Sequence, residues 1–301
     1  MCSTFKFKNC MGRNYDYEVS YDEEVIFIPS GEKVCQNQYD IIGIGSGLFK
    51  EYPMLYDAMN SQGLCMSGLA FQGNAKYNQF NKSKFNLPVY KFIPYILGNF
   101  KTVKDFKSFA NEEGLNLTDT RYNDNTPNAE LHWFLCDKEQ SIAIESTKDG
   151  LQIYDNPYGT LTNNPPFDEQ KSYFEIDFIG EDENYYIKEL GKEWATRGLE
   201  TCGLSGGYTS TERFERLTYL KQHLEQYDMA DPVIDSFKLC QSVEQLYGCT
   251  PVKDKYEYTI YQAVYDMDFL TLDVKLYKNT NPYHYSIHRE SFNKIKRYKL
   301  K

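Results

Sequence analysis

The chain begins Met1-Cys2-Ser3-Thr4-Phe5-Lys6-Phe7, and the segment Gly12-Arg13-Asn14-Tyr15-Asp16 follows a few residues later. In the first segment, Phe5 and Phe7 alternate with polar residues, a pattern of period two that predicts a β-strand. Cys2 is therefore expected at the start of a first strand. The second segment is expected on a neighbouring strand, which would bring its charged residues close to Cys2.

Cys2 is a candidate nucleophile because of its place in the chain. A residue as small as cysteine in second position lets the initiator methionine be removed, which leaves an α-amine and a thiol on one residue. The α-amine titrates at about 7.7–8.0 and a free thiol at about 8.5, so the two groups can share a proton near neutral pH. Nucleophile and base would then be the same residue.

Two further segments carry groups that could assist such a nucleophile. Arg13 could stabilise a thiolate and Asp16 could orient an ammonium group, although Arg-x-x-Asp is also typical of a surface salt bridge. Asn163, in Leu161-Thr162-Asn163-Asn164-Pro165-Pro166, could donate a hydrogen bond to a developing oxyanion, although asparagine before proline also favours a turn.

A glycine-rich segment precedes a predicted helix that begins with an arginine. The segment reads Gly203-Leu204-Ser205-Gly206-Gly207-Tyr208-Thr209-Ser210-Thr211-Glu212-Arg213. Taken alone, it is a flexible entry to a capped helix. Arg213 becomes a candidate site residue only together with the other segments.

The remaining pattern groups strands with strands and helices with helices, which favours an α+β fold over a βαβ alternation. We expect two antiparallel sheets packed face to face, helices outside them, and no linker between independent domains. Thr102 and Asp105 resemble a capping box, and residues 137–140 a hairpin turn. Further strands are predicted at residues 25–28, 41–44, 64–71, 131–135, 142–145, 151–154, 257–266 and 269–277, and helices at residues 89–100, 103–110, 213–227 and 232–241.

Composition disfavours several classes of binding partner and cofactor. The 301 residues are 41% hydrophobic, enough for a sizeable core, and the formal charge of −10 disfavours nucleic acid and anionic membranes. No apolar run approaches the ~18 residues of a membrane span, and no secretory signal is evident, so we expect a cytoplasmic protein. The eight cysteines form no C-x-x-C pair, and His284 and His288 have no evident third ligand, so no metal is expected.

Together these segments resemble the choloylglycine hydrolase family of N-terminal-nucleophile hydrolases, which contains bile salt hydrolases and penicillin V acylases. The resemblance covers nearly the whole chain. It rests on Cys2, the Gly12–Asp16 element, the Leu161–Asn163 element and the loop before Arg213. It also includes Gly63-Leu64, Gly68-Leu69-Ala70-Phe71 and Leu131-His132-Trp133.

The resemblance implies a single four-layer αββα domain of residues 2–301, with Met1 removed, that hydrolyses a linear amide through an acyl thioester. It also implies that the enzyme is a bacterial homotetramer acting on a small-molecule amide. Thiol acyl transfer needs no metal or organic cofactor, and no motif calls for one. The implied roles are Cys2 as nucleophile with its α-amine as base, Arg13 beside the thiol, Asp16 holding the α-amine, Asn163 and the backbone N–H of Ala70 as oxyanion donors, and Arg213 as a supporting residue.

Some positions depart from the family pattern. Ala70 stands where bile salt hydrolases usually carry Asn and penicillin V acylases Tyr. Ser205 and Gly207 replace a Pro and an Asp, which suggests a looser loop, and Glu212 could draw Arg213 into a salt bridge. The first functional hypothesis is a conjugated bile salt hydrolase. The alternatives are an acylase of penicillin V or N-acyl homoserine lactones, and an inactive family member that serves in binding or assembly.

Overall fold

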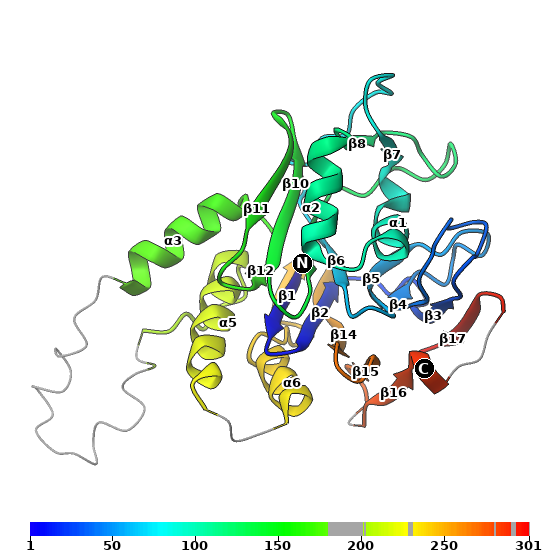
Figure 1. The fold of residues 1–301 in the computed structure, drawn as a ribbon. Coiled ribbons are helices and arrows are strands. Elements are labelled where there is room, and N and C mark those ends of the chain that lie inside the picture. Colours follow the sequence, from blue (N-terminus) through cyan, green and yellow to red (C-terminus); the bar gives the residue numbers. More distant parts are fainter. Residues whose placement is uncertain (180–200, 202, 228–230, 280, 290–292, 301) are drawn as a thin grey trace, which may run out of the picture.

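The chain folds into two antiparallel sheets flanked by helices (Figure 1). The computed structural model describes residues 1–301 except 180–200, 202, 228–230, 280, 290–292 and 301. The first sheet has the order β12 (Thr160–Leu161), β1 (Cys2–Phe7), β2 (Cys10–Tyr17), β14 (Lys255–Asp266), β15 (Thr271–Leu276) and β16 (Tyr283–Ser286), with β13 (Thr250–Val252) paired to β14.

The second sheet has the order β11 (Gly150–Asp155), β10 (Ser141–Thr147), β9 (Leu131–Cys136), β6 (Cys65–Ala70), β5 (Leu55–Asn60), β4 (Ile41–Gly45), β3 (Glu24–Ile28) and β17 (Lys296–Lys299). A short parallel pair joins β7 (Asn86–Pro88) to β8 (Asn116–Thr118). The helices are η1 (Val89–Lys91), α1 (Phe92–Asn99), α2 (Val103–Glu112), α3 (Phe167–Ile179), α5 (Ser210–Glu225), α6 (Pro232–Ser242) and the short η4 (Ile287–Arg289).

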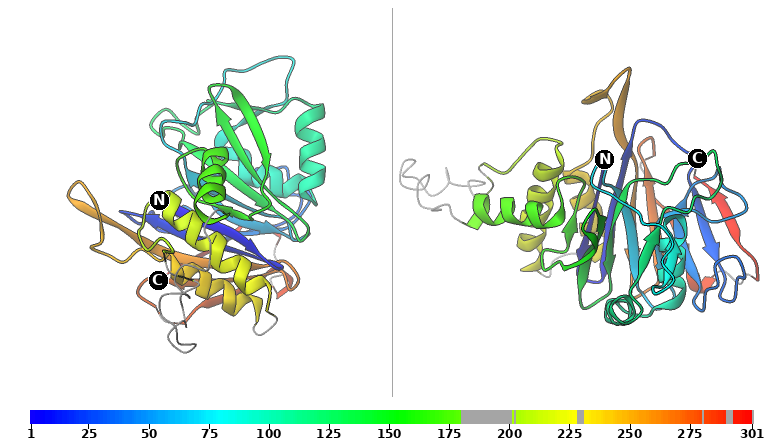
Figure 2. Two further views of the ribbon diagram at one scale, coloured as in Figure 1. Left: turned by 90° about the vertical axis from the view of Figure 1, so that its left-hand side faces the viewer. Right: turned by 90° about the horizontal axis from the view of Figure 1, so that it is seen from above.

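Hydrophobic clusters separate the layers. One cluster contains buried residues of both sheets and fills the space between them. A second joins the outer face of the β3–β6 and β9–β10 sheet to α1 and α2, and a third joins β1 to α5 and α6. The views in Figure 2 show these helices on opposite sides of the paired sheets. The expected α+β class and the αββα layering are both confirmed.

The alternation in β1 fixes which way Cys2 faces. Phe5 and Phe7 belong to the cluster beneath α5 and α6, whereas Cys2 belongs to the cluster between the sheets. Gly12 lies opposite Phe5 on β2, and a Cβ at Gly12 would lie only 2.2 Å from the Phe5 ring. The absence of a side chain at Gly12 lets the phenyl ring lie flat across the neighbouring strand.

Most predicted elements are present. The Thr102 capping box is confirmed, and Asp137 closes the hairpin by accepting hydrogen bonds from the backbone of Glu139 and Gln140. The expected helix over 89–100 divides into η1 and α1, and the helix containing Arg213 begins earlier, at Ser210. Strand β5 was not predicted, nor was α3.

The structure bears on the expectations about membrane spans, cysteines and metal ligands. Within the described residues, no helix is both long and apolar enough to cross a membrane. Seven cysteines in the described part of the chain are free thiols, while Cys202 lies outside it. His284 lies on β16 with Nδ1 2.9 Å from Asp273 Oδ1, and no group of three or more metal-ligating side chains occurs among the described positions.

The contact between Gly12 and Phe5 yields a stability prediction. Gly12→Ala should lower the free energy of unfolding by roughly 1–3 kcal/mol, because the added methyl forces the Phe5 ring out of a filled core. Urea denaturation of the single variant, of Phe5→Leu and of the double variant checks this. Leucine leaves more room beside position 12, so the two changes should cost less together than their sum. Additive costs would contradict the proposed clash.

Candidate active site

Cys2 lies where three segments distant in sequence meet. It is the first residue of β1, is 5% exposed, and pairs with Tyr15 of β2 in the strand register. On its other side β1 pairs with β12, which ends just before Asn163. The sheet therefore brings the cysteine, the charged residues of β2 and Asn163 together, as the sequence predicted.

Arg213 connects these segments from a third direction. Its side chain is fully buried and enters from the first turn of α5. Nη1 donates to the main-chain O of Cys2 and to Ser3 Oγ, both at 2.6 Å, and Nη2 donates to Asn163 Oδ1 at 2.9 Å. Burial lowers the pKa of Arg213, and this is opposed mainly by the negative charge of Asp16, whose Oδ2 lies 4.0 Å from Nη1.

Glu212 does not redirect Arg213, so that expectation was wrong. The Glu212 carboxylate forms a capping box with Thr209 instead, accepting from its hydroxyl at 2.6 Å and its backbone N–H at 3.2 Å. A Cβ at Gly207 would lie 2.2 Å from this carboxylate. The two departures from the family pattern are thus linked, since Glu212 occupies the space that a side chain at position 207 would need.

The loop before α5 is also tied down, contrary to the expectation of looseness. Arg216 donates to the main-chain O atoms of Ser205 and Gly207, the latter at 3.0 Å. Ser205 in turn donates its hydroxyl to Glu215 Oε2 at 2.5 Å. Helix α5 therefore holds the loop through its own side chains.

Asn163 has a defined orientation. Its Oδ1 accepts from Arg213 and, at 2.7 Å, from the backbone N–H of Cys2. Because a guanidinium only donates, the atom facing Arg213 must be the oxygen, which directs Nδ2 toward Ala70. Nδ2 donates to the main-chain O of Ala70 at 2.9 Å. The two residues expected to bind an oxyanion are thus in direct contact.

Arg13 is a buried cation that does not use all of its hydrogen-bond donors within the described structure. Nη2 donates to the main-chain O of Gly68 at 2.7 Å, and Nε lies 3.6 Å from Asp57 Oδ2. Within the described structure, Nε and Nη1 have no hydrogen-bond partner. Burial acts to lower the pKa of Arg13, but the charges of Cys2 and Asp57 outweigh it and raise the pKa. The electrostatic effect of Cys2 means that Arg13 can stabilise a thiolate there.

Asp57, on the unpredicted strand β5, balances Arg13. It is fully buried and accepts hydrogen bonds of 2.5 Å from the hydroxyls of Tyr261 and Tyr265. Burial raises the pKa of Asp57, while Arg13 and the two tyrosines oppose the rise. These residues were missed from the sequence, because none of them stands in a recognisable local pattern.

Asp16 is buried beside the N-terminus. Its carboxylate accepts from Thr259 Oγ1 at 2.6 Å and from Gln245 Nε2 at 3.0 Å. With Met1 in place, the terminal ammonium contacts the main-chain O of Asp16 at 2.8 Å and Glu257 Oε1 at 2.5 Å. Glu257 was not anticipated as a site residue.

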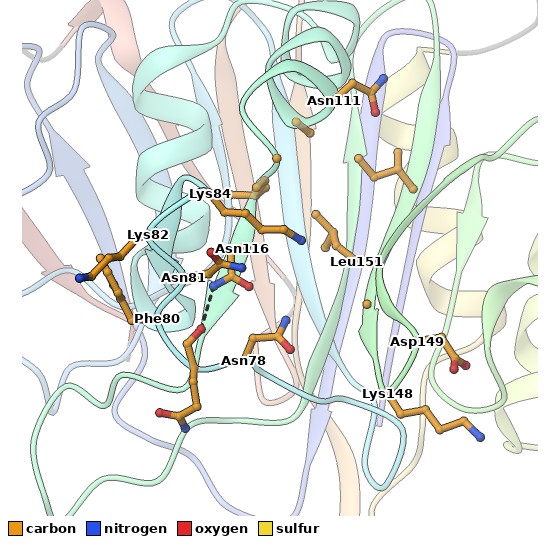
Figure 3. Close-up of a pocket in the computed structure, with 16 residues that line it drawn as sticks. Asn78, Phe80, Asn81, Lys82, Lys84, Asn111, Asn116, Lys148, Asp149 and Leu151 are labelled. Atoms are coloured by element: carbon orange, nitrogen blue, oxygen red, sulfur yellow. Dashed lines mark hydrogen bonds between the residues drawn. The ribbon is translucent and has the colours of Figure 1, made fainter.

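Two surface hollows differ in their position relative to this cluster: one lies away from it and the other lies beside the loop that leads to Arg213. The larger, of about 900 Å³, is lined by the 78–84 loop, the end of α2 and the β10–β11 hairpin, and none of the expected site residues lines it (Figure 3). Lys84 and several asparagine side chains surround it. A smaller hollow of about 390 Å³ adjoins Gly206, Tyr208 and Arg216, beside the loop that leads to Arg213.

Comparisons with known proteins agree with this geometry. The sequence model of the linear amide C–N hydrolases, choloylglycine hydrolase family, matches residues 1–297. A bile salt hydrolase/transferase from Lactiplantibacillus plantarum is 37% identical over 96% of this chain and 93% of its own length. Another of the same name, from Clostridium perfringens, is 31% identical over 96% of this chain and 92% of its own length.

Solved structures show the same fold. The C2A mutant of conjugated bile acid hydrolase from Clostridium perfringens matches with a TM-score of 0.90 and 29% identity, covering 100% of this chain and 97% of that one. Penicillin V acylase from Agrobacterium tumefaciens shares the fold, with a TM-score of 0.73 and 18% identity over 99% of this chain and 90% of that one. The chain therefore belongs to the choloylglycine hydrolase family and is a linear amide C–N hydrolase with the N-terminal-nucleophile fold.

Proposed function

We propose that this enzyme hydrolyses conjugated bile salts, releasing glycine or taurine from a steroid acid through an acyl thioester at Cys2. The observation that carries the proposal is the Asn163 carboxamide, which bridges the backbone nitrogen of Cys2 and the carbonyl of Ala70. The names of the matched relatives supply the substrate class, since two of them are bile salt hydrolase/transferases. Penicillin V acylase matches at a level that supports only the fold.

The mature enzyme is proposed to be one domain of residues 2–301. With Met1 attached, the nitrogen of Cys2 belongs to a peptide bond, and its delocalised lone pair cannot act as a base. Removal of Met1 would convert this nitrogen into an amine next to Asn163 Oδ1. It would also leave the Glu257 carboxylate without its Met1 partner, close to the new terminus.

The proposed reaction starts with transfer of the thiol proton to the α-amine of Cys2. The sulfur, whose charge raises the pKa of Arg13, attacks the amide carbon, and the carbonyl oxygen becomes an oxyanion. Asn163 Nδ2 and the N–H of Ala70 donate to that oxygen. The C–N bond breaks, the leaving amine takes the proton from the α-ammonium, and water then hydrolyses the thioester with the same amine as base.

Arg213 and Asp16 are proposed as supporting groups. Arg213 fixes Cys2 through its carbonyl oxygen and fixes Asn163 through Oδ1, so it sets the distance between nucleophile and oxyanion donor. Asp16 is held by Thr259 and Gln245, which leaves its carboxylate in place to orient the α-ammonium of the processed chain.

The setting of the enzyme is also a proposal. Free thiols throughout the described part of the chain support a reducing compartment, the bacterial cytoplasm, and the bacterial sources of the relatives agree with it.

We propose a homotetramer on family resemblance, with exposed aromatic side chains at Tyr247 and Tyr256 as candidate contact groups. Light scattering of the purified enzyme should give about four times the chain mass of 35.3 kDa.

The substrate class can be tested directly. Purified enzyme is incubated with glycocholate, taurocholate and penicillin V, and the released amines are measured. Release of glycine or taurine well above that of 6-aminopenicillanic acid is expected. Silence on both bile salts would overturn the proposal. Cleavage of penicillin V alone would favour the penicillin V acylase. Silence on all three would leave the N-acyl homoserine lactone acylase and the inactive binding protein, which release of homoserine lactone from an N-acyl homoserine lactone would separate.

The oxyanion role of Asn163 makes a second prediction. Asn163→Ala should lower kcat by about 100- to 1,000-fold, the usual cost of removing one preorganised donor. Asn164→Ala is the matched control, because the neighbouring amide contacts Asn74 and the main-chain O of Gln72 and not Cys2. Steady-state kinetics of both variants check this, and equal rates would refute the assignment.

A further inference from the structure

His132 is a buried histidine in the Leu131-His132-Trp133 segment that has no role in the proposed reaction. It lies on β9, is 0% exposed, and stacks on Phe71 with ring centroids 4.3 Å apart and planes at 7°. Its Nδ1 lies 3.0 Å from Glu145 Oε1, and its Nε2 lies 2.7 Å from the main-chain O of Thr162. Both ring nitrogens are engaged, so the imidazole has one orientation.

The hydrogen bonds define where the protons are. A carbonyl oxygen only accepts, so Nε2 must carry a proton toward Thr162. One further proton lies between Nδ1 and Glu145 Oε1. The backbone N–H of Phe167 also donates to this oxygen, at 2.9 Å, so two groups hold Glu145 Oε1 in place. The imidazole is thus hydrogen-bonded at both ring nitrogens, to Glu145 and to Thr162, which holds it in one orientation.

The His132–Glu145 pair touches both sides of the proposed oxyanion site. Phe71, on which the imidazole stacks, follows Ala70 directly, and Thr162, to which the imidazole donates, precedes Asn163 directly. We propose that His132, held by Glu145, is a positioning residue that sets the spacing between the Ala70 and Asn163 donors. The inference deepens the proposed function and rests on it for the role of these two residues.

The peptide between Thr162 and Asn163 is held at both ends. His132 donates to its carbonyl oxygen, and its N–H donates to Ser210 Oγ at 2.8 Å. The plane of this peptide fixes the Cα of Asn163 and hence the direction in which Nδ2 points. Loss of the imidazole bond would free one end and let the donor move. A displacement of about 1 Å at such a site can cost about 100-fold in rate.

Two substitutions separate positioning from bulk stability. In His132→Gln, the side-chain NH₂ reaches the place of Nε2 and keeps the bond to Thr162. In His132→Asn, the shorter NH₂ occupies the place of Nδ1, keeps Glu145 and loses Thr162. His284→Asn is the control for removing a histidine that pairs with an aspartate, since exposed His284 lies on β16, at the other edge of the sheet from β12 and β1.

The measurement is kcat and KM on glycocholate, with active sites counted by iodoacetamide labelling of Cys2. We expect kcat per labelled Cys2 to fall about 100-fold in His132→Asn and less than about tenfold in His132→Gln, with KM nearly unchanged. His284→Asn should match wild type. A structural role alone would lower the melting temperature and the labelled fraction in both His132 variants and leave kcat per labelled site intact, which would overturn the inference.

Hydrogen exchange gives a readout that needs no substrate. The backbone amides of residues 160–164 should exchange about tenfold faster in His132→Asn than in His132→Gln, as expected for the loss of one buried hydrogen bond. If wild type does not cleave bile salts, the proposed function fails while exchange still decides this inference. Equal exchange rates at residues 160–164 in the two variants would overturn the positioning role of His132. This holds even if one of the variants is less stable than wild type.

Discussion

The buried guanidinium of Arg213 is the interaction on which the site depends. It hydrogen-bonds to the carbonyl of Cys2, the hydroxyl of Ser3 and the carboxamide of Asn163, and its Nε donates to the main-chain O of Tyr208 at 2.9 Å. One cation thus joins the first strand, the segment after β12 and the entry to α5. A planar group with five donors suits this task, and a lysine could not replace its geometry.

Burying such charges is costly unless they are paired, and the fold pairs them across large sequence separations. Asp57 opposes Arg13 and is itself satisfied by Tyr261 and Tyr265. Arg13 nevertheless retains N–H groups with no partner among the described residues. In the proposed mechanism, these N–H groups remain available to a thiolate at Cys2, whereas a cation with every donor already paired would stabilise that anion less.

Local patterns predicted much of the fold, and long-range pairing explains what they missed. The alternation around Phe5 correctly predicted the first strand, and the expected site residues Cys2 and Asn163 are in direct contact, although the strand before Asn163 was not predicted. Strand β5 was not predicted because Asp57 interrupts its apolar pattern. The tyrosines that hydrogen-bond to Asp57 lie more than 200 residues further along the chain. Glu257 was not predicted as a site residue for a similar reason, since its contact with the N-terminus exists only in the folded chain.

We propose that the sulfur and the amine that act on the amide belong to one terminal residue. Mass spectrometry of enzyme that is acid-quenched during glycocholate turnover can detect this arrangement. We expect a cholyl group on the peptide that begins with Cys2, with Met1 absent from every acylated molecule. Turnover by a chain that still carries Met1, or an acyl group on any other residue, would contradict it.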